Sequence, residues 1–138
     1  MLWHRSGSFA IPNLAYAGGG SGAWKPIELE TAQLAFGDSG GAVIAVRSAC
    51  GEDQAPLDVA SRHLWLGLPR EDRERRHIEV AGLPAIETVG FSDGVRIQTV
   101  VLETGTCTLD LAYAALQGQA ADAVFEGFLR RVQVRPER

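Results

Sequence analysis

Several features are scarce or missing in this 138-residue sequence, and each absence narrows the class of protein. No run of apolar residues approaches 18, so no segment is expected to span a membrane. Positive charge is not in excess, because 13 Lys and Arg residues face 17 Asp and Glu residues, for a net charge of −4. Nucleic-acid binding needs a basic surface that neutralises phosphates, so we expect no nucleic-acid partner.

Export signals are also missing from the start of the chain. Residues Met1 to Arg5 lack the apolar core of a signal peptide, and there is no lipobox cysteine. The chain is therefore expected in the periplasm or cell envelope if an export signal was removed or missed, and otherwise in the cytoplasm. Membrane association would require a lipid anchor that is absent from this chain.

Reactive groups do not gather in the sequence. The three histidines and two cysteines lack the spacing of metal ligands. Asp58 and Asp110 are isolated, so no pair of carboxylates for acid–base catalysis can be named. We expect no metal, no cofactor and no catalytic residue.

The composition that remains is typical of a globular domain. Hydrophobic residues make up 46% of the chain and charged residues 22%, and the length suffices to bury a core. There are no internal repeats, so residues 1–138 are expected to form one domain. Residues 1–23 are expected to be partly flexible, with a glycine-rich loop at 17–23.

The strongest local pattern is a hairpin between Val95 and Ala115, in which apolar side chains alternate along two strands. A loop centred on Gly105 predicts three opposed pairs: Val101 with Leu109, Thr99 with Leu111, and Ile97 with Tyr113. A slip of one residue would place Val101 opposite Asp110 and turn an apolar face to water, so the register is expected to be well specified.

Further strands are predicted on both sides of this hairpin: Ser8 to Pro12, Trp24 to Leu29, Gln33 to Phe36, Ala42 to Ser48, His77 to Val80, and Leu83 to Val89. Pro26 predicts an edge position for its strand. Ala81-Gly82 and Ser92-Asp93-Gly94 are predicted turns, and the mixed charges of Arg70 to His77 are typical of a solvated loop.

Two helices are predicted, one beginning near Pro56 and ending at Gly67, the other from Ala120 to Val132. The second carries an apolar stripe that includes Phe125 and Phe128, so we expect it to dock on the sheet. Segregated strands and helices indicate an α+β fold, an antiparallel sheet with two helices packed on it.

The segment Gly37-Asp38-Ser39-Gly40-Gly41 resembles the sequence around the nucleophile of trypsin-like serine proteases. In those enzymes, backbone N–H groups form an oxyanion hole beside an activated serine. The order of catalytic residues does not fit, because Ser39 comes early and His4 is the sole histidine upstream. Gly, Asp and Ser also make ordinary hairpin loops, which is the interpretation we adopt. A small serine hydrolase using Ser39 stays as the alternative function.

Two cysteines and two tryptophans are further candidates. Cys50 ends a predicted strand and Cys107 opens another, so they either form a disulfide between neighbouring strands or remain two buried thiols. Trp24 and Trp65 are interpreted as core or rim aromatics. They are also the candidates for contact with a partner, and Trp65 for contact with a small ligand between sheet and first helix.

From Trp24 onward, the sequence resembles a group of uncharacterised bacterial lipoproteins with a PsbP-like α/β/α sandwich. The segments that carry the resemblance are Ala42 to Cys50 (AVIAVRSAC), Pro56 to Leu68 (PLDVASRHLWLGL), Val80 to Thr88 (VAGLPAIET), Thr106 to Ala115 (TCTLDLAYAA) and Val124 to Leu129 (VFEGFL). In that group one cysteine ends the strand before the first helix and another opens a late strand. Cys50 and Cys107 occupy those places, so the resemblance favours the disulfide.

The resemblance also implies an envelope location and no known enzymatic site. Proteins that share this fold, such as the extrinsic PsbP subunit of photosystem II, act by binding partners. The expected function is therefore a non-catalytic partner-binding or scaffold domain of the bacterial cell envelope, with an unidentified protein partner.

Overall fold

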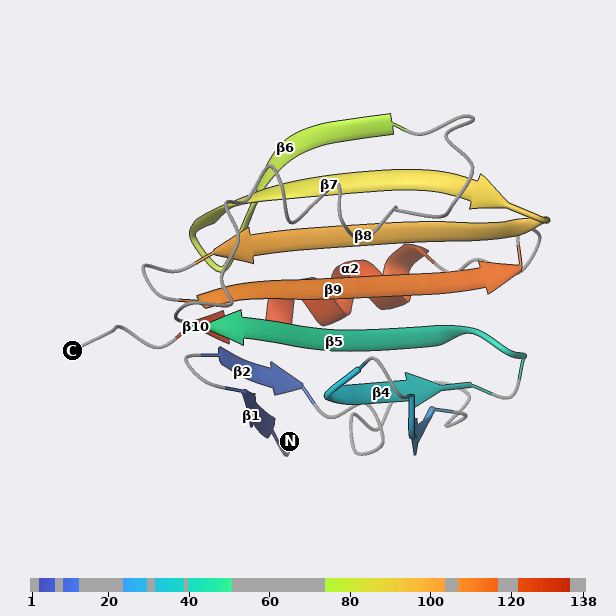
Figure 1. The fold of residues 1–138 in the computed structure, drawn as a ribbon, viewed down its shortest axis with the longest axis horizontal. Helices are drawn as coiled ribbons and strands as arrows, with labels where there is room; N and C mark the ends of the chain where they lie inside the picture. The colour runs from blue at the N-terminus through green and yellow to red at the C-terminus, as the bar shows by residue number, and fades with distance from the viewer. Residues whose placement is uncertain are drawn as a thin grey trace.

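Antiparallel strands make up most of the described chain (Figure 1). The computed structural model describes residues 3–6, 9–12, 24–29, 32–38, 40–50, 74–103, 107–116 and 122–134. Its elements are β1 (Trp3–Ser6), β2 (Phe9–Pro12), β3 (Lys25–Ile27), β4 (Leu34–Gly37), β5 (Val43–Cys50), β6 (Glu74–Val80), β7 (Leu83–Ser92), β8 (Val95–Glu103), β9 (Cys107–Leu116), α2 (Asp122–Arg131) and β10 (Gln133–Val134).

Within these ranges the strands form two sheets. The larger has seven strands in the order β3-β4-β5-β9-β8-β7-β6, and the smaller has the order β1-β2-β10. In the larger sheet, every pair of neighbours but one is consecutive in sequence. The exception is β5 with β9, so two meanders, β3–β5 and β6–β9, meet along one seam.

The predicted fold class, an α+β sheet with two packed helices in a PsbP-like α/β/α sandwich, is wrong. The described chain is an all-β fold, 71% strand and 12% helical, with a single helix, α2. The helix predicted near Pro56 falls in residues 51–73, which lie outside the described residues. Strand content is higher than expected because β7 continues to Ser92 and because Glu74 to His77, predicted as solvated loop, belong to β6.

The predicted hairpin between Val95 and Ala115 exists as β8 and β9, but its predicted register is wrong by one residue. Val101 lies opposite Asp110, and Leu102 lies opposite Leu109. The prediction assumed one buried face and one face in water. Val100 and Val101 point to opposite faces and are both fully buried, so burial on one face alone does not select the register.

Both tight turns predicted in the second meander are confirmed. Ala81-Gly82 joins β6 to β7, and Asp93-Gly94 joins β7 to β8. All four residues have positive φ, with Gly82 at 80° and Gly94 at 78°, as two-residue hairpin turns require. Pro26 lies in β3, the terminal strand at one edge of the described sheet, as predicted.

The predicted C-terminal helix is confirmed as α2, which lies against one face of the large sheet behind β8 and β9 in Figure 1. Its Phe125 ring stacks on Tyr113 of β9 at 5.4 Å and on Phe128 at 6.4 Å between ring centroids. Phe9 and Ile11 of β2 belong to the same buried cluster. Within the described ranges, no helix has the length and apolarity needed to cross a bilayer.

The first 23 residues contribute β1 and β2 to this fold. The glycine-rich loop predicted at 17–23 lies outside the described residues.

Candidate functional site

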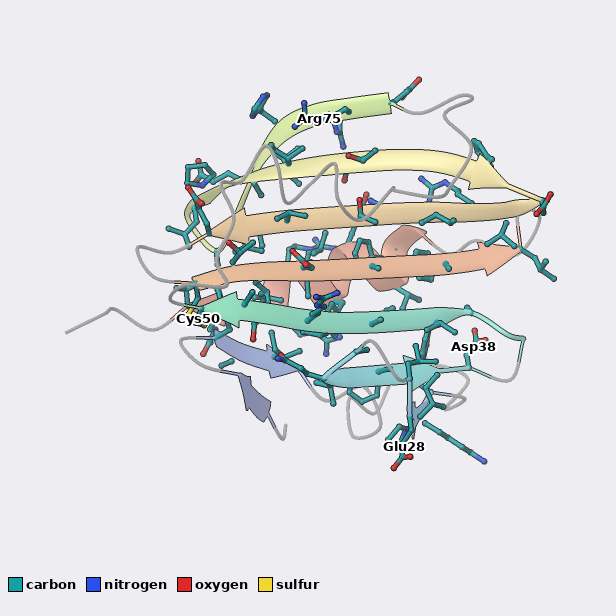
Figure 2. The ribbon with its side chains drawn as sticks, in the orientation of Figure 1. Glu28, Asp38, Cys50 and Arg75 are labelled. Atoms are coloured by element: carbon teal, nitrogen blue, oxygen red, sulfur yellow. A yellow bond between two sulfur atoms is a disulfide. The ribbon has the colours of Figure 1, made fainter. Side chains whose placement is uncertain are left out.

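The two cysteines lie directly opposite each other where β5 ends and β9 begins, and they form a disulfide (Figure 2). The two Cα atoms are 4.1 Å apart, and 57 positions separate the residues in sequence. Cys107 is buried and Cys50 is exposed. The bridge therefore closes one end of the seam between the two meanders.

The hairpin predicted about Gly37–Gly41 is confirmed: Gly37 ends β4 and pairs with Val43 of β5. The Asp38 carboxylate oxygen Oδ1 accepts hydrogen bonds from the backbone N–H groups of Gly40, at 2.9 Å, and Ala42, at 2.8 Å. The Asp38 N–H donates to the Ala42 carbonyl at 3.0 Å. These bonds brace the turn from within, which is what Asp does in hairpin loops. Ser39 lies outside the described residues.

The tryptophan candidates do not meet at a described site. Trp24 is half-buried and packs against the edge of the core cluster, next to β3. Trp65 lies outside the described residues. In the part of the chain that the structure describes, no three His, Cys, Asp or Glu side chains gather to hold a metal ion.

A chain of polar side chains that sequence reasoning did not single out crosses β6, β7 and β8. Arg76 lies opposite Glu87 and donates from Nε to its Oε1 at 2.6 Å. Gln98 donates from Nε2 to Glu87 Oε2 at 2.9 Å. Arg96 donates from Nη1 to Gln98 Oε1 at 3.3 Å. By strand register, all four side chains share the sheet face that α2 covers.

Exposure to solvent differs sharply among these four hydrogen-bonded side chains. The Glu87 side chain is 8% exposed, whereas that of Arg76 is 72% exposed. The hydrogen bond and charge of Glu87 raise the pKa of Arg76 above its ordinary value, and Glu126 of α2 and Glu74 raise it further. Both Glu87 oxygens accept a hydrogen bond, one of them from Arg76, so this carboxylate orients the Arg76 guanidinium.

These residues border a surface hollow of about 560 Å³. Among the described residues, its lining consists of Glu74, Arg75, Arg76, Glu87, Val89 and Arg96. This described lining thus holds three arginines and two glutamates, and Glu87 is paired with Arg76. A second hollow of about 540 Å³ lies along β3 and β4, where Ile27 and Leu29 are exposed. The first hollow is the better candidate site because its charged groups are held in fixed positions.

A signal for the first hollow was present in the sequence. Arg76 lies five residues before Ala81 and Glu87 five residues after Gly82, so the predicted turn sets them opposite each other. The mixed charges of Arg70 to His77 favour a solvated loop, however, and a loop would leave Arg76 without a strand partner.

Comparisons with known proteins give a likeness of fold. No protein-family model and no curated protein matches the sequence. A crystal structure of a protein from Bacteroides thetaiotaomicron is similar over 94% of this chain, with a TM-score of 0.63 and 12% sequence identity. This chain spans 46% of that protein's chain. At this identity the likeness concerns the fold alone.

Proposed function

We propose that this chain is a non-catalytic partner-binding domain and that the hollow beside β6 receives an acidic side chain of a protein partner. The observation that carries the proposal is the hydrogen-bonded chain from Arg76 through Glu87 and Gln98 to Arg96. It places charged groups in fixed positions at a surface hollow.

The stability of the fold gives little reason for a series of hydrogen-bonded polar side chains at these positions. Burying a carboxylate such as that of Glu87 costs free energy, and replacing two buried hydrogen-bonded side chains by apolar ones of similar shape can be nearly neutral or stabilising. On the same face of the same strands, Ala85, Val100 and Leu102 are buried in the core. A recognition role accounts for polar residues where the neighbouring positions are apolar.

The chemistry of the hollow favours a carboxylate as the group recognised. A guanidinium held in place loses less conformational entropy when it pairs with a carboxylate than a freely rotating one does. The Glu87 bond uses Arg76 Nε, and the Arg76 side chain as a whole is largely exposed. Since both Glu87 oxygens are hydrogen-bonded, this carboxylate holds the Arg76 guanidinium in position.

The disulfide supports a location outside the reducing cytoplasm. Structural disulfides form and persist in oxidising compartments, such as the bacterial periplasm. The Cys50–Cys107 bridge joins strands from two different meanders and is thus part of the fold. We therefore propose that the binding domain works in the bacterial cell envelope.

An NMR titration tests the proposal, with hexaglutamate as the acidic probe and hexalysine as its opposite. Hexaglutamate is expected to shift the amide signals of β6, β7 and β8 around Arg76, and added salt is expected to weaken the effect. Arg76→Gln should abolish the shifts. Lys25→Gln removes a positive charge from the opposite edge of the sheet and should leave them unchanged. Shifts that survive Arg76→Gln, or that hexalysine reproduces, would contradict the proposal.

A further inference from the structure

The two edges of the seven-stranded sheet differ in their capacity to accept another strand. At one edge, β3 has three residues and contains Pro26, and both features block strand addition. At the other edge, β6 has seven residues and no proline. It is the outermost strand along the upper margin of Figure 1. In the described chain, β6 is thus the edge suited to pairing.

The turn at Ala81-Gly82 determines which backbone groups of β6 face outward. Val80 and Leu83 flank this two-residue turn, so they form a hydrogen-bonded pair. Alternate residues from Val80 back to Glu74 therefore direct their N–H and C=O groups toward β7. The residues between them, Arg75, His77 and Glu79, direct these groups away from β7.

The charges on these three residues are arranged symmetrically about His77. Arg75 lies two positions before His77, and Glu79 lies two positions after it. All three side chains are exposed. When a second β6 is laid antiparallel with the two His77 residues opposed, Arg75 of each copy faces Glu79 of the other. This register overlaps all seven residues, whereas a register centred on Arg76 would oppose two arginines.

We propose that the chain forms a symmetric dimer through antiparallel pairing of β6 with β6 of a second copy, which joins the two large sheets into one. A twofold contact of this kind closes on itself, and the blocked β3 edge prevents growth into a filament. The proposal goes beyond the binding function proposed above and does not depend on it.

The contact between the two β6 strands is small, so we expect a weak dimer. Seven residues span roughly 24 Å at about 3.4 Å per residue. A single strand-to-strand edge falls in the class of weak, transient interfaces. We expect a dissociation constant on the order of 10 to 100 µM.

Sedimentation equilibrium of charge-reversal variants tests the dimer and its register. Glu79→Arg opposes two arginines at each end of the contact and is expected to weaken dimerisation at least tenfold, since like charges directly opposite each other repel. Arg75→Glu opposes two glutamates and should do the same. A mixture of the two single variants restores both opposite-charge pairs, so it should form a heterodimer of near wild-type affinity. The double variant should recover the homodimer.

Matched controls reverse charge at the other edge of the sheet. Lys25→Glu and Glu28→Arg are exposed changes on and beside β3 and should leave the dimer unaffected. A wild-type chain that stays monomeric at about 1 mM would overturn the proposal. A dimer that is insensitive to Glu79→Arg, or two variants that fail to rescue each other, would overturn it as well.

The dimer proposal and the binding proposal can be refuted independently of each other. Glu79 does not line the hollow, so Glu79→Arg leaves the hexaglutamate titration as a separate measurement. A monomeric chain that still binds hexaglutamate through Arg76 would overturn the dimer and leave the binding function in place.

Discussion

Glu87 accepts a hydrogen bond at each of its two carboxylate oxygens in a buried position. One oxygen pairs with the exposed Arg76, and the other accepts a hydrogen bond from Gln98. Gln98 is itself buried and accepts a hydrogen bond from Arg96. At the scale of single residues, the candidate site therefore depends on a neutral side chain, Gln98, which links two charged ones.

Gln98→Leu is expected to destabilise the fold by about 1–3 kcal/mol, because Glu87 Oε2 then lacks its buried donor. Glu87→Leu combined with Gln98→Leu should recover most of that loss, since no buried carboxylate is left without a donor. Urea denaturation of the two variants and the wild type measures both effects. A double variant that is less stable than Gln98→Leu would show that the polar chain is needed for stability, against our interpretation of it as a recognition element.

At the scale of elements, α2 covers one face of the large sheet, and β6 is the terminal strand at one of its edges. The stripe of Phe125, Phe128, Leu129 and Val132 is buried, as its helical spacing in the sequence predicts. The charged segment at the start of β6 has no comparable regular spacing of apolar residues. It is a strand because β7 supplies a hydrogen-bonding partner, and an edge strand tolerates charged side chains.

Phe125→Ala is expected to destabilise the protein by about 3–5 kcal/mol, because this fully buried ring stacks on both Tyr113 and Phe128. Glu126→Ala, the next residue of the same helix, is exposed and should change stability little. Thermal or urea unfolding of the two variants compares them. Equal losses would contradict the expectation that the buried contact of Phe125 with the sheet is the source of its effect on stability.

At the scale of the whole molecule, the large sheet is two meanders joined by the β5–β9 seam. Each meander is built from hairpins between consecutive strands, whereas β5 and β9 are far apart in sequence. The Cys50–Cys107 bridge lies at one end of the seam. It therefore restrains the contact within the large sheet that costs the unfolded chain the most entropy to form.

Removing the bridge with Cys50→Ala and Cys107→Ala is expected to destabilise the protein by about 4 kcal/mol, as the entropy of closing so long a loop predicts. Urea denaturation of the wild type with and without reductant should show a comparable loss. The double variant, which has no disulfide, should not respond to reductant. A thiol count near two on unreduced, unfolded wild-type protein would contradict both the bridge and the envelope location.

The sequence by itself determined the features that depend on residues close together in the chain. The turns at Ala81-Gly82 and Asp93-Gly94, the Asp38 loop and the apolar stripe of α2 all follow from local spacing. Tertiary structure alone decided the register of β8 with β9, the extension of β6 over Glu74 to Arg76, the joining of β5 to β9, and the hollow around Glu87. Each of these depends on contacts between distant segments. Val101 is the clearest example. It is buried on the opposite face of the sheet from Val100, and the alternation of side chains along one strand does not predict that both faces are buried.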